Sequence, residues 1–280
     1  MLTSRQFEQA RHLALRLAGI ELVDRHREVL YRRSVRLGIF DGNGLDALLR
    51  AAEDGDPIAS QRLVSMFTTN LTGFFRHPAH FDVAAKHAVR AAQRRSQARC
   101  WSAAAATGEE PYSLAMAMTE VFRREETRVT ILATDIDVEA LAVARRGEYS
   151  VRALAGLGAE RLERFFTALT ASHWGIKPAV RRLVEFGALN LVEVARMHIE
   201  GPFDVIFCRN VLMYLEASYR YSVVERLASL LAPDGLLILD PTEHLGKAGH
   251  FFASAAADGV YTRRRALSYS ATRELERLHR

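Results

Sequence analysis

Two carboxylates stand side by side at the start of a predicted helix, at Glu109 and Glu110 in the sequence ATGEEP. A helix N-terminus favours anions and often binds phosphate, but two carboxylates there would repel a phosphate and attract an ammonium group. The turn contains one glycine, Gly108, and lacks the G-x-G-x-x-G pattern of dinucleotide-binding proteins. We therefore expect a nucleotide-like ligand with a positive charge and no phosphate, two conditions that S-adenosylmethionine meets. Alternatively, the glutamates only complement the helix dipole.

An acidic and an amide side chain follow the next two predicted strands. Asp135 ends the strand VTILATD, about 27 residues after Gly108, near where folds of this kind place an acid on the ribose hydroxyls. Its alternative role is to cap the next helix, which Asp137 can do instead. Asn190 in FGALN could contact the adenine or ribose of the same ligand, or it could only form a turn.

Three further polar residues follow a later apolar run. Arg209 and Asn210 leave the tip of FDVIFC, and Tyr214 comes one helical turn later. In parallel sheets, ligands bind at the carboxyl ends of the strands, where these residues would meet Asp135 and Asn190. Each residue alone is a modest signal, but their order along one fold favours a single ligand site.

The elements that must position these residues differ between the two parts of the chain. Residues 1–72 have helical spacing, with a capping box expected at Thr3 and Gln6. From about residue 99, helical segments alternate with the predicted strands RCWSAA, VTILATD, VEFGALN, FDVIFC and LLILD, and two final strands lie around a glycine turn in FFASAAADGVYTRRRAL. This alternation predicts a parallel, doubly wound α/β sheet. The expected parts are the helical residues 1–72, a linker and connecting helix at 73–98, the sheet domain at 99–280, and a small insertion at 149–182.

Charge and composition bound the possible partners. The chain has 280 residues and a formal net charge of +5, which favours an acidic partner, whether nucleic acid, anionic membrane or protein. Its only cysteines, Cys100 and Cys208, lie in apolar runs, so we expect buried free thiols and a cytoplasmic protein. No apolar run has the length of a membrane span, and charges from Arg5 onward interrupt any signal-peptide core.

Six motifs carry a resemblance that covers nearly the whole chain: NLTGFFR, ATGEEPYSLAM, ATDID, GALNL, FDVIFCRNVLMYL and LLAPDGLLIL. With these motifs, in this order, the chain resembles the CheR family of chemotaxis receptor methyltransferases. The resemblance implies a Rossmann-like class I S-adenosylmethionine methyltransferase sheet, an all-α N-terminal domain for receptor recognition, and a small inserted β-subdomain. It also implies methyl transfer to receptor glutamates for sensory adaptation, which gives γ-glutamyl methyl esters and S-adenosylhomocysteine.

The same resemblance assigns roles to residues. Arg76, directly after Phe74 and Phe75, would steer the incoming carboxylate by a bidentate contact. Tyr214 would line the same entrance to the cofactor site and help to orient the substrate. Without the resemblance, an ordinary interdomain salt bridge explains Arg76 equally well. The expected cofactor-binding residues are Asn70, Thr72, Arg76, Gly108, Glu109, Asp135, Asn190, Leu191, Arg209 and Asn210.

The implied reaction needs little acid–base chemistry. A glutamate has a reference pKa of about 4.3, so it is an ionised nucleophile at pH 7. A methyl group on a sulfonium needs no acid to leave. The sequence has no G-x-S-x-G motif, and its histidines, including His77 and His80, form no convincing metal-binding set. We therefore expect the protein to supply mainly alignment, without a metal.

A basic helix is expected at residues 24–37, where Arg25, Arg32 and Arg36 share a face and Arg33 lies beside them. By the resemblance, this helix docks on the glutamate-rich cytoplasmic helical bundle of chemoreceptors; alternatively, it is only a solvated face. In some relatives the insertion grips a peptide at the receptor's C-terminus, but here the insertion is a few residues shorter. We therefore expect no dependence on such a tail. A monomer is the default expectation, since the sequence leaves the oligomeric state open.

Two other functions fit the composition. A nucleic-acid methyltransferase would suit the basic residues 90–99, but CRNV replaces the Asn/Asp-Pro-Pro motif that cradles an amino group, and no aromatics interleave with the basic run. A non-catalytic adaptor that binds the cofactor is the third possibility, which only turnover can exclude. The prediction is receptor methylation, with no nucleic acid and no membrane insertion.

Overall fold

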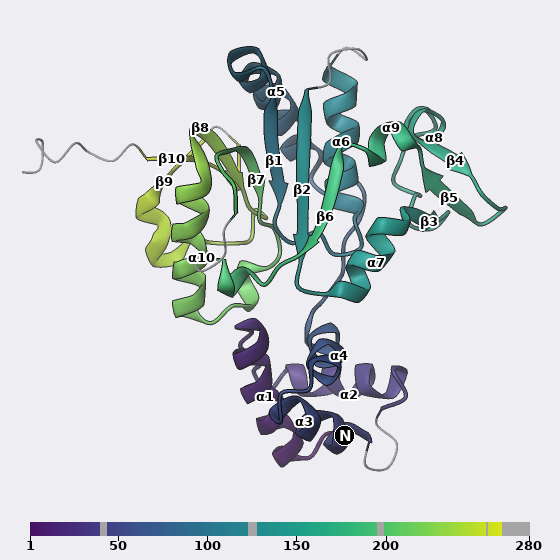
Figure 1. Cartoon of the computed structure of the whole chain (residues 1–280), viewed down its shortest axis with the longest axis vertical. Coiled ribbons are helices and arrows are strands. Elements are labelled where there is room, and N and C mark those ends of the chain that lie inside the picture. The colour runs from purple at the N-terminus through teal and green to yellow at the C-terminus, as the bar shows by residue number, and fades with distance from the viewer. Residues whose placement is uncertain (40–43, 123–127, 195–198, 256, 265–280) are drawn as a thin grey trace, which may run out of the picture.

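The computed structural model describes residues 1–39, 44–122, 128–194, 199–255 and 257–264. The described chain forms a group of helices and a larger α/β part (Figure 1). No helix among these residues is long and apolar enough to cross a membrane. Cys100 and Cys208 are buried free thiols, as predicted, and burial raises the pKa of both.

The helical group precedes the sheet and consists of α1 (Ser4–Ala18), α2 (His26–Arg36), α3 (Gly44–Glu53) and α4 (Pro57–Phe67). The predicted capping box begins α1, because the Thr3 hydroxyl accepts from the Gln6 N–H and the Gln6 side chain accepts from the Thr3 N–H. Asp56 caps α4 ahead of Pro57. The apolar faces of these helices meet in one core, whose fully buried residues include Phe7, Leu13, Leu49 and Leu63.

The central sheet of the described chain has seven strands in the order β6-β2-β1-β7-β8-β10-β9. They are β1 (Ala98–Ser102), β2 (Val129–Asp135), β6 (Val184–Ala188), β7 (Phe203–Phe207), β8 (Leu231–Ile238), β9 (Phe252–Ser254) and β10 (Val260–Arg263). The five strands from β6 to β8 are parallel, but β10 is antiparallel to both of its neighbours. The predicted parallel, doubly wound sheet is therefore confirmed from β6 to β8, and the two final strands extend it as an antiparallel pair. The reason is the predicted glycine turn, at Gly259, which reverses the chain between β9 and β10.

Helices cover both faces of the central sheet. The connecting helix α5 (Pro78–Arg95) and α6 (Glu109–Val121) share one core with the sheet, whereas α10 (Ala217–Leu230) shares another. Cys100 and Trp101 are neighbours in β1 and belong to these two different cores, because side chains of a strand alternate between its faces. Helix α7 (Val138–Arg146) packs beside β2 and β6.

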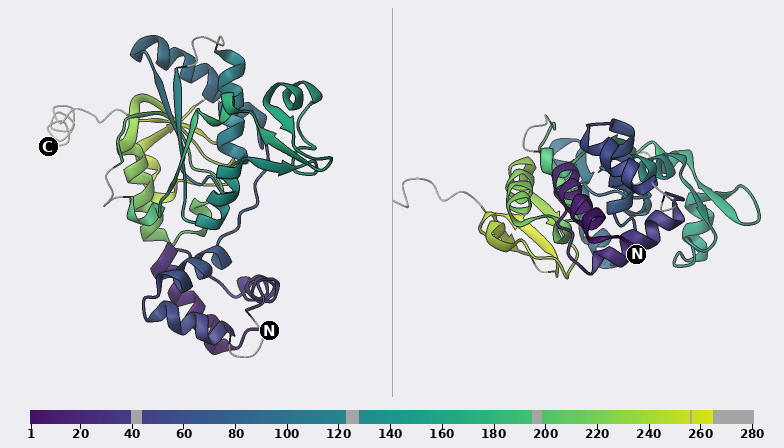
Figure 2. Two further views of the ribbon diagram at one scale, coloured as in Figure 1. Left: turned by 45° about the vertical axis from the view of Figure 1, so that its right-hand side comes forward. Right: turned by 90° about the horizontal axis from the view of Figure 1, so that it is seen from below.

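A second, smaller sheet lies beside α6 and α7 (Figures 1 and 2). Its strands β3 (Glu148–Ser150), β4 (Phe166–Ala168) and β5 (His173–Ile176) pair antiparallel in the order β3-β5-β4. Two short helices, α8 (Ala159–Phe165) and α9 (Pro178–Arg181), accompany them. We call residues 148–182 the inserted subdomain.

The carboxyl ends of the parallel strands point toward the helical group (Figure 1). The strand order reverses between β1 and β7, since β2 and β6 extend the sheet on one side and β7 and β8 on the other. Such a switch point leaves room for a ligand. The short 3₁₀ helices η1 (Leu191–Glu193) and η2 (Leu212–Tyr214) follow β6 and β7 at this end, and η3 (Gly246–Phe251) precedes β9.

Candidate active site

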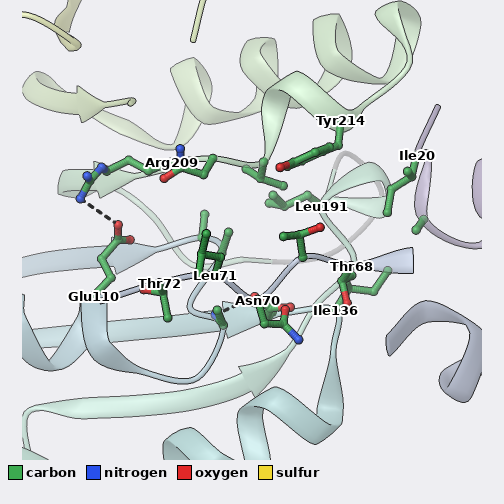
Figure 3. Close-up of a pocket in the computed structure, with 18 of the residues that line it drawn as sticks. Ile20, Thr68, Asn70, Leu71, Thr72, Glu110, Ile136, Leu191, Arg209 and Tyr214 are labelled. Atoms are coloured by element: carbon green, nitrogen blue, oxygen red, sulfur yellow. Dashed lines mark hydrogen bonds and ion pairs between the residues drawn. The ribbon is translucent and has the colours of Figure 1, made fainter. Parts of the chain in front are cut away.

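A pocket opens at the carboxyl ends of β1, β2 and β7, next to the segment that joins α4 to α5 (Figure 3). Ala18 and Ile20 of the helical group also line it, so it lies at the seam between the two parts of the chain. The loop after β1 contributes small alanine side chains, which leave space for a ligand. Most of the predicted site residues line this pocket: Asn70, Thr72, Arg76, Asp135, Asn190, Leu191, Arg209, Asn210 and Tyr214.

Two predicted cofactor-binding residues, Gly108 and Glu109, do not line the pocket. Gly108 has a φ of +99°, and a Cβ there would lie only 2.8 Å from the Ala144 Cβ, so the position requires glycine for the turn itself. Glu109 points elsewhere, since its Oε2 accepts a hydrogen bond of 2.6 Å from the Thr107 hydroxyl. The neighbouring Glu110 is the carboxylate that lines the pocket.

Glu110 and Arg209 form a buried ion pair at the inner wall of the pocket (Figure 3). The Arg209 Nη1 lies 3.2 Å from the Glu110 Oε2, and the Ser102 hydroxyl donates to the Glu110 Oε1 at 2.9 Å. Burial raises the pKa of Glu110, and the charge of Arg209 offsets part of this rise. The Arg209 Nε and Nη2 have no hydrogen-bond partner among the described residues. Buried N–H groups of this kind can bind an anionic ligand.

Asp135 and Asp137 have different roles at the end of β2. Asp137 caps α7, accepting from the N–H groups of Glu139 and Ala140, as the sequence suggested it could. Asp135 lines the pocket instead, while its two oxygens accept from the N–H groups of Ala106 and Asp137 at 2.8 and 2.9 Å. Burial raises the pKa of Asp135, and these hydrogen bonds partly oppose the shift.

The two asparagines predicted to contact a ligand use their amide nitrogens to join the helical group to the sheet. The Asn70 Nδ2 donates to the Asp137 Oδ2 at 2.6 Å, next to a hydrogen bond from the Thr68 hydroxyl to the same oxygen. The Asn190 Nδ2 donates to the Leu17 carbonyl at 2.9 Å. Both side chains still line the pocket, but their amide N–H groups hold its wall together.

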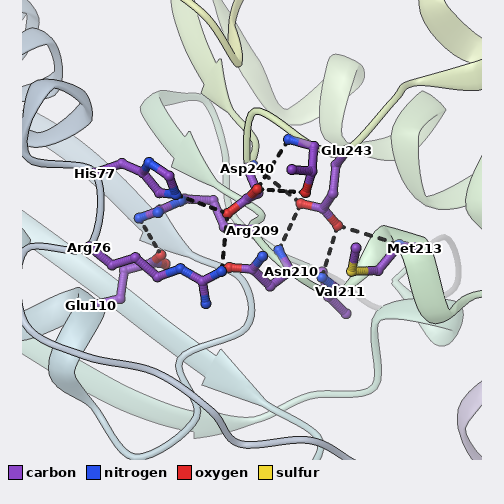
Figure 4. Close-up of polar contacts among 10 residues, drawn as sticks. Arg76, His77, Glu110, Arg209, Asn210, Val211, Met213, Asp240 and Glu243 are labelled. Carbon is purple, nitrogen blue, oxygen red and sulfur yellow. Dashed lines mark hydrogen bonds and ion pairs between the residues drawn. The ribbon is translucent and has the colours of Figure 1, made fainter.

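Arg76 reaches the pocket from outside the sheet and has a buried partner behind it (Figure 4). Its Nη2 lies 3.5 Å from the Oδ2 of Asp240, and the His77 Nε2 lies 3.3 Å from the same oxygen. The Arg76 side chain is 41% exposed, whereas that of Asp240 is 2% exposed. Burial alone would raise the pKa of Asp240, but hydrogen bonds from Thr242 and the charge of Arg76 lower it below its usual range. Sequence reasoning missed Asp240, although LLILD places an acid at the end of a predicted strand.

Glu243 organises the turn that carries Tyr214 (Figure 4). Its buried carboxylate accepts from the backbone N–H groups of Asn210, Val211 and Met213 at 2.7, 3.0 and 3.4 Å. Burial raises the pKa of Glu243, and these hydrogen bonds oppose the rise. The Tyr214 carbonyl in turn accepts from the Glu21 N–H at 2.9 Å, which ties η2 to the helical group. No motif in the sequence pointed to Glu243.

The four arginines predicted to bind a receptor are not equivalent. Arg25, Arg32 and Arg36 are exposed at or within α2, and Arg32 pairs with Glu28 one turn away. Arg33 is partly buried and donates to the Met66 carbonyl at 2.8 Å and to the Thr69 hydroxyl at 2.9 Å. Its guanidinium therefore braces the segment that leads into the pocket, and burial lowers its pKa.

The charges of the pocket suit a nucleoside that carries amino-acid groups. The carboxylates of Glu110 and Asp135 can accept hydrogen bonds from an ammonium group and from ribose hydroxyls. The unpaired N–H groups of Arg209 can bind a carboxylate. S-adenosylmethionine carries all of these groups, so the residues present fit it.

Comparisons with known proteins agree with this geometry. The family model for the CheR methyltransferase, SAM binding domain, matches residues 70–260. The chain is 37% identical over 250 residues to a chemotaxis protein methyltransferase of Salmonella typhimurium, covering 87% of this chain and 85% of that protein. It is 38% identical over 261 residues to chemotaxis protein methyltransferase 2 of Pseudomonas aeruginosa, covering 90% of this chain and 91% of that protein. Since these matches cover most of the chain, it belongs to the CheR family of S-adenosylmethionine-dependent methyltransferases.

Proposed function

We propose that this chain methylates glutamate side chains of chemoreceptors, giving glutamyl methyl esters for sensory adaptation. Its relatives from Salmonella typhimurium and Pseudomonas aeruginosa are chemotaxis protein methyltransferases, which supports this class of substrate. The observation that carries the proposal is the exposed guanidinium of Arg76 on the pocket wall, with the buried Asp240 behind it. A guanidinium in this place suits an incoming carboxylate, because its fork matches the two carboxylate oxygens.

The cofactor would be held by the strand ends. Asp135 would bind the ribose hydroxyls, Glu110 the ammonium group and Arg209 the carboxylate, as their charges and places in the pocket support. Gly108 and Glu109 would act indirectly, through the turn that sets the start of α6. The remaining walls would come from Asn70, Thr72, Asn190, Leu191 and Asn210.

When bound, S-adenosylmethionine supplies an electrophilic methyl group on a sulfonium and is converted into S-adenosylhomocysteine. An acceptor glutamate has a reference pKa of about 4.3 and needs no base at pH 7. Arg76 and Tyr214 would therefore orient its carboxylate and would transfer no proton. Tight pairing with Arg76 would weaken the nucleophile, and the nearby Asp240 limits this by sharing the guanidinium's charge.

Receptor docking would use the helical group. Residues 1–72 would recognise the receptor, 73–98 would connect them to the methyltransferase domain at 99–280, and residues 149–182 would be its insertion. The exposed Arg25, Arg32 and Arg36 on α2 would face the acidic helical bundle of the receptor, whereas Arg33 would support the pocket segment. We also propose a cytoplasmic monomer that does not depend on a receptor tail peptide.

The test is methyl transfer from radiolabelled S-adenosylmethionine to a purified cytoplasmic fragment of a chemoreceptor. We expect label on glutamate side chains in peptide maps, released as methanol by mild alkali, and loss of most turnover in Arg76→Ala. Alkali-stable label, or label on a nucleic acid added in competition, would reject the proposed substrate.

A further inference from the structure

The inserted subdomain packs against the two aromatic residues that precede Arg76. The Phe74 ring lies edge-on to the rings of Tyr149 in β3 and Phe166 in β4, with centroid distances of 4.9 and 5.6 Å. The guanidinium of Arg161 in α8 lies 3.8 Å from the centroid of the Phe75 ring. Phe75 also lies edge-on to Phe81 in α5, with a centroid distance of 5.3 Å, so its ring is held between the connecting helix and the inserted subdomain.

The backbone around Arg76 is strained. Phe75 has a φ of +51° and His77 a φ of +59°, so a non-glycine residue in the left-handed region stands on each side of Arg76. This conformation is unfavourable for a residue that carries a Cβ, and it persists only where the surroundings hold it. The Phe75 N–H donates to the Ser113 hydroxyl at 2.9 Å, which fixes one point of this turn. The ring contacts of Phe74 and Phe75, together with the contacts of Arg76 and His77 with Asp240, hold the rest.

Arg161 is itself fixed in place. Its Nε and Nη2 donate to the two carboxylate oxygens of Glu120 at 2.8 and 2.9 Å, a bidentate pair with α6 of the main domain. A bidentate pair sets the plane of the guanidinium as well as its position. This plane lies against Phe75, so the contact runs from α6 through α8 to the residue next to Arg76.

We propose that Arg161 is a positioning residue for methyl transfer. Glu120 fixes the Arg161 guanidinium, and the guanidinium packs on Phe75. This contact stabilises the strained turn that directs Arg76 into the pocket. The inserted subdomain is then part of the active-site framework of this chain, whether or not it binds a receptor peptide. This inference rests on the proposed role of Arg76 in orienting the acceptor carboxylate.

The test compares Arg161→Met with a matched control on the same helix, Arg164→Met. Arg164 also stacks on an aromatic ring, that of Phe165 at 5.0 Å, but Phe165 is not part of the FFR run. We expect Arg161→Met to lower kcat for receptor methylation by about tenfold, because small misplacements of an orienting group are costly. Its Tm should fall by no more than about a few degrees, as expected for a partly exposed ion pair. Arg161→Lys should recover part of the loss, and Arg164→Met should match the wild type.

Two further measurements separate positioning from a general structural effect. In an Arg76→Ala background, Arg161→Met should change kcat by less than about twofold, since residues that act through each other are not additive. Hydrogen exchange of the Phe75 amide, measured without substrate, should speed up in Arg161→Met. The positioning role would be overturned if Phe75 exchanged in Arg161→Met at the wild-type rate. It would also be overturned if the losses in kcat from Arg76→Ala and Arg161→Met were fully additive. An inactive wild type with the expected change in exchange would instead reject only the proposed function.

Discussion

The guanidinium of Arg209 and the carboxylate of Glu110 form an ion pair inside the protein, with Nη1 3.2 Å from Oε2. Arg209 follows β7, and Glu110 lies in the first turn of α6, which follows β1. The pair therefore joins the two strand ends on either side of the switch point. Both side chains are almost fully buried. Each charge is therefore stabilised by the other, and the Nε and Nη2 atoms of Arg209 remain to bind a ligand.

Removal of one charge of this pair should lower the free energy of unfolding. Glu110→Gln leaves Arg209 as a buried charge without its counter-ion, and we expect a loss of about 3 kcal/mol in the free energy of unfolding, measured with urea. Glu109→Gln is the matched control, because it weakens only the hydrogen bond with Thr107 and should cost about 1 kcal/mol or less. Equal losses in the two variants would contradict the importance of the ion pair.

Glu243 should affect turnover through the turn that it holds. In Glu243→Gln, an NH₂ group replaces one of the oxygens that accept from the Asn210, Val211 and Met213 N–H groups. We expect kcat for methyl transfer to fall by about tenfold, because Tyr214 follows directly on this turn. Glu216→Gln, at the exposed cap of α10, serves as the control and should keep wild-type kcat. A Glu243→Gln enzyme as fast as this control would show that the turn does not need the carboxylate.

Asp137 should contribute stability that is lost in acid. Burial alone would raise its pKa, but hydrogen bonds from Asn70, Ser65 and Thr68 lower it below the ordinary value. A carboxyl whose folded pKa lies below its unfolded value of about 3.9 stabilises the protein above that pH, and the contribution disappears as pH falls through the folded pKa. We expect the difference in unfolding free energy between wild type and Asp137→Asn to be largest near pH 7 and to shrink below about pH 4. A difference that stays constant from pH 7 to pH 3 would contradict the lowered pKa.

The arginines of α2 should differ in what their substitution affects, receptor binding for the exposed ones and stability for Arg33. Arg36→Glu reverses an exposed charge, so it should weaken receptor binding at low salt and leave stability and S-adenosylhomocysteine binding unchanged. Arg33→Ala removes hydrogen bonds to the Met66 carbonyl and the Thr69 hydroxyl and should lower the free energy of unfolding by about 1–3 kcal/mol. Calorimetry with a receptor fragment and urea unfolding measure the two effects. The assignment fails if Arg33→Ala is as stable as the wild type.

The sequence predicts the arrangement of the sheet because short apolar runs, each bounded by a turn, alternate with helical segments. It also predicts that Asp135, Arg209 and Asn210 meet, since residues that follow parallel strands gather at one edge of the sheet. It further predicts two final strands around a glycine turn, and they form the antiparallel pair of β9 and β10 around Gly259.

The details of the site depend on side-chain directions that no spacing reveals. The adjacent carboxylates of Glu109 and Glu110 have the same signal in the sequence, but only Glu110 points into the pocket. Asp240 and Glu243 act on Arg76 and on the Tyr214 turn from a loop after β8, and these long-range contacts leave no local pattern. For the same reason, the role of Arg33 as a brace is visible only once α2 is packed against the end of α4.

The central claim is that the pocket at the strand ends holds the cofactor, and calorimetric titration with S-adenosylhomocysteine tests it most directly. Wild type should bind one equivalent, and Asp135→Asn should bind at least about tenfold more weakly, as expected for loss of a charge-assisted hydrogen bond. Glu216→Gln, at the exposed cap of α10, should bind like the wild type. A folded wild type that does not bind, or an Asp135→Asn variant that binds as tightly as the wild type, would contradict the account.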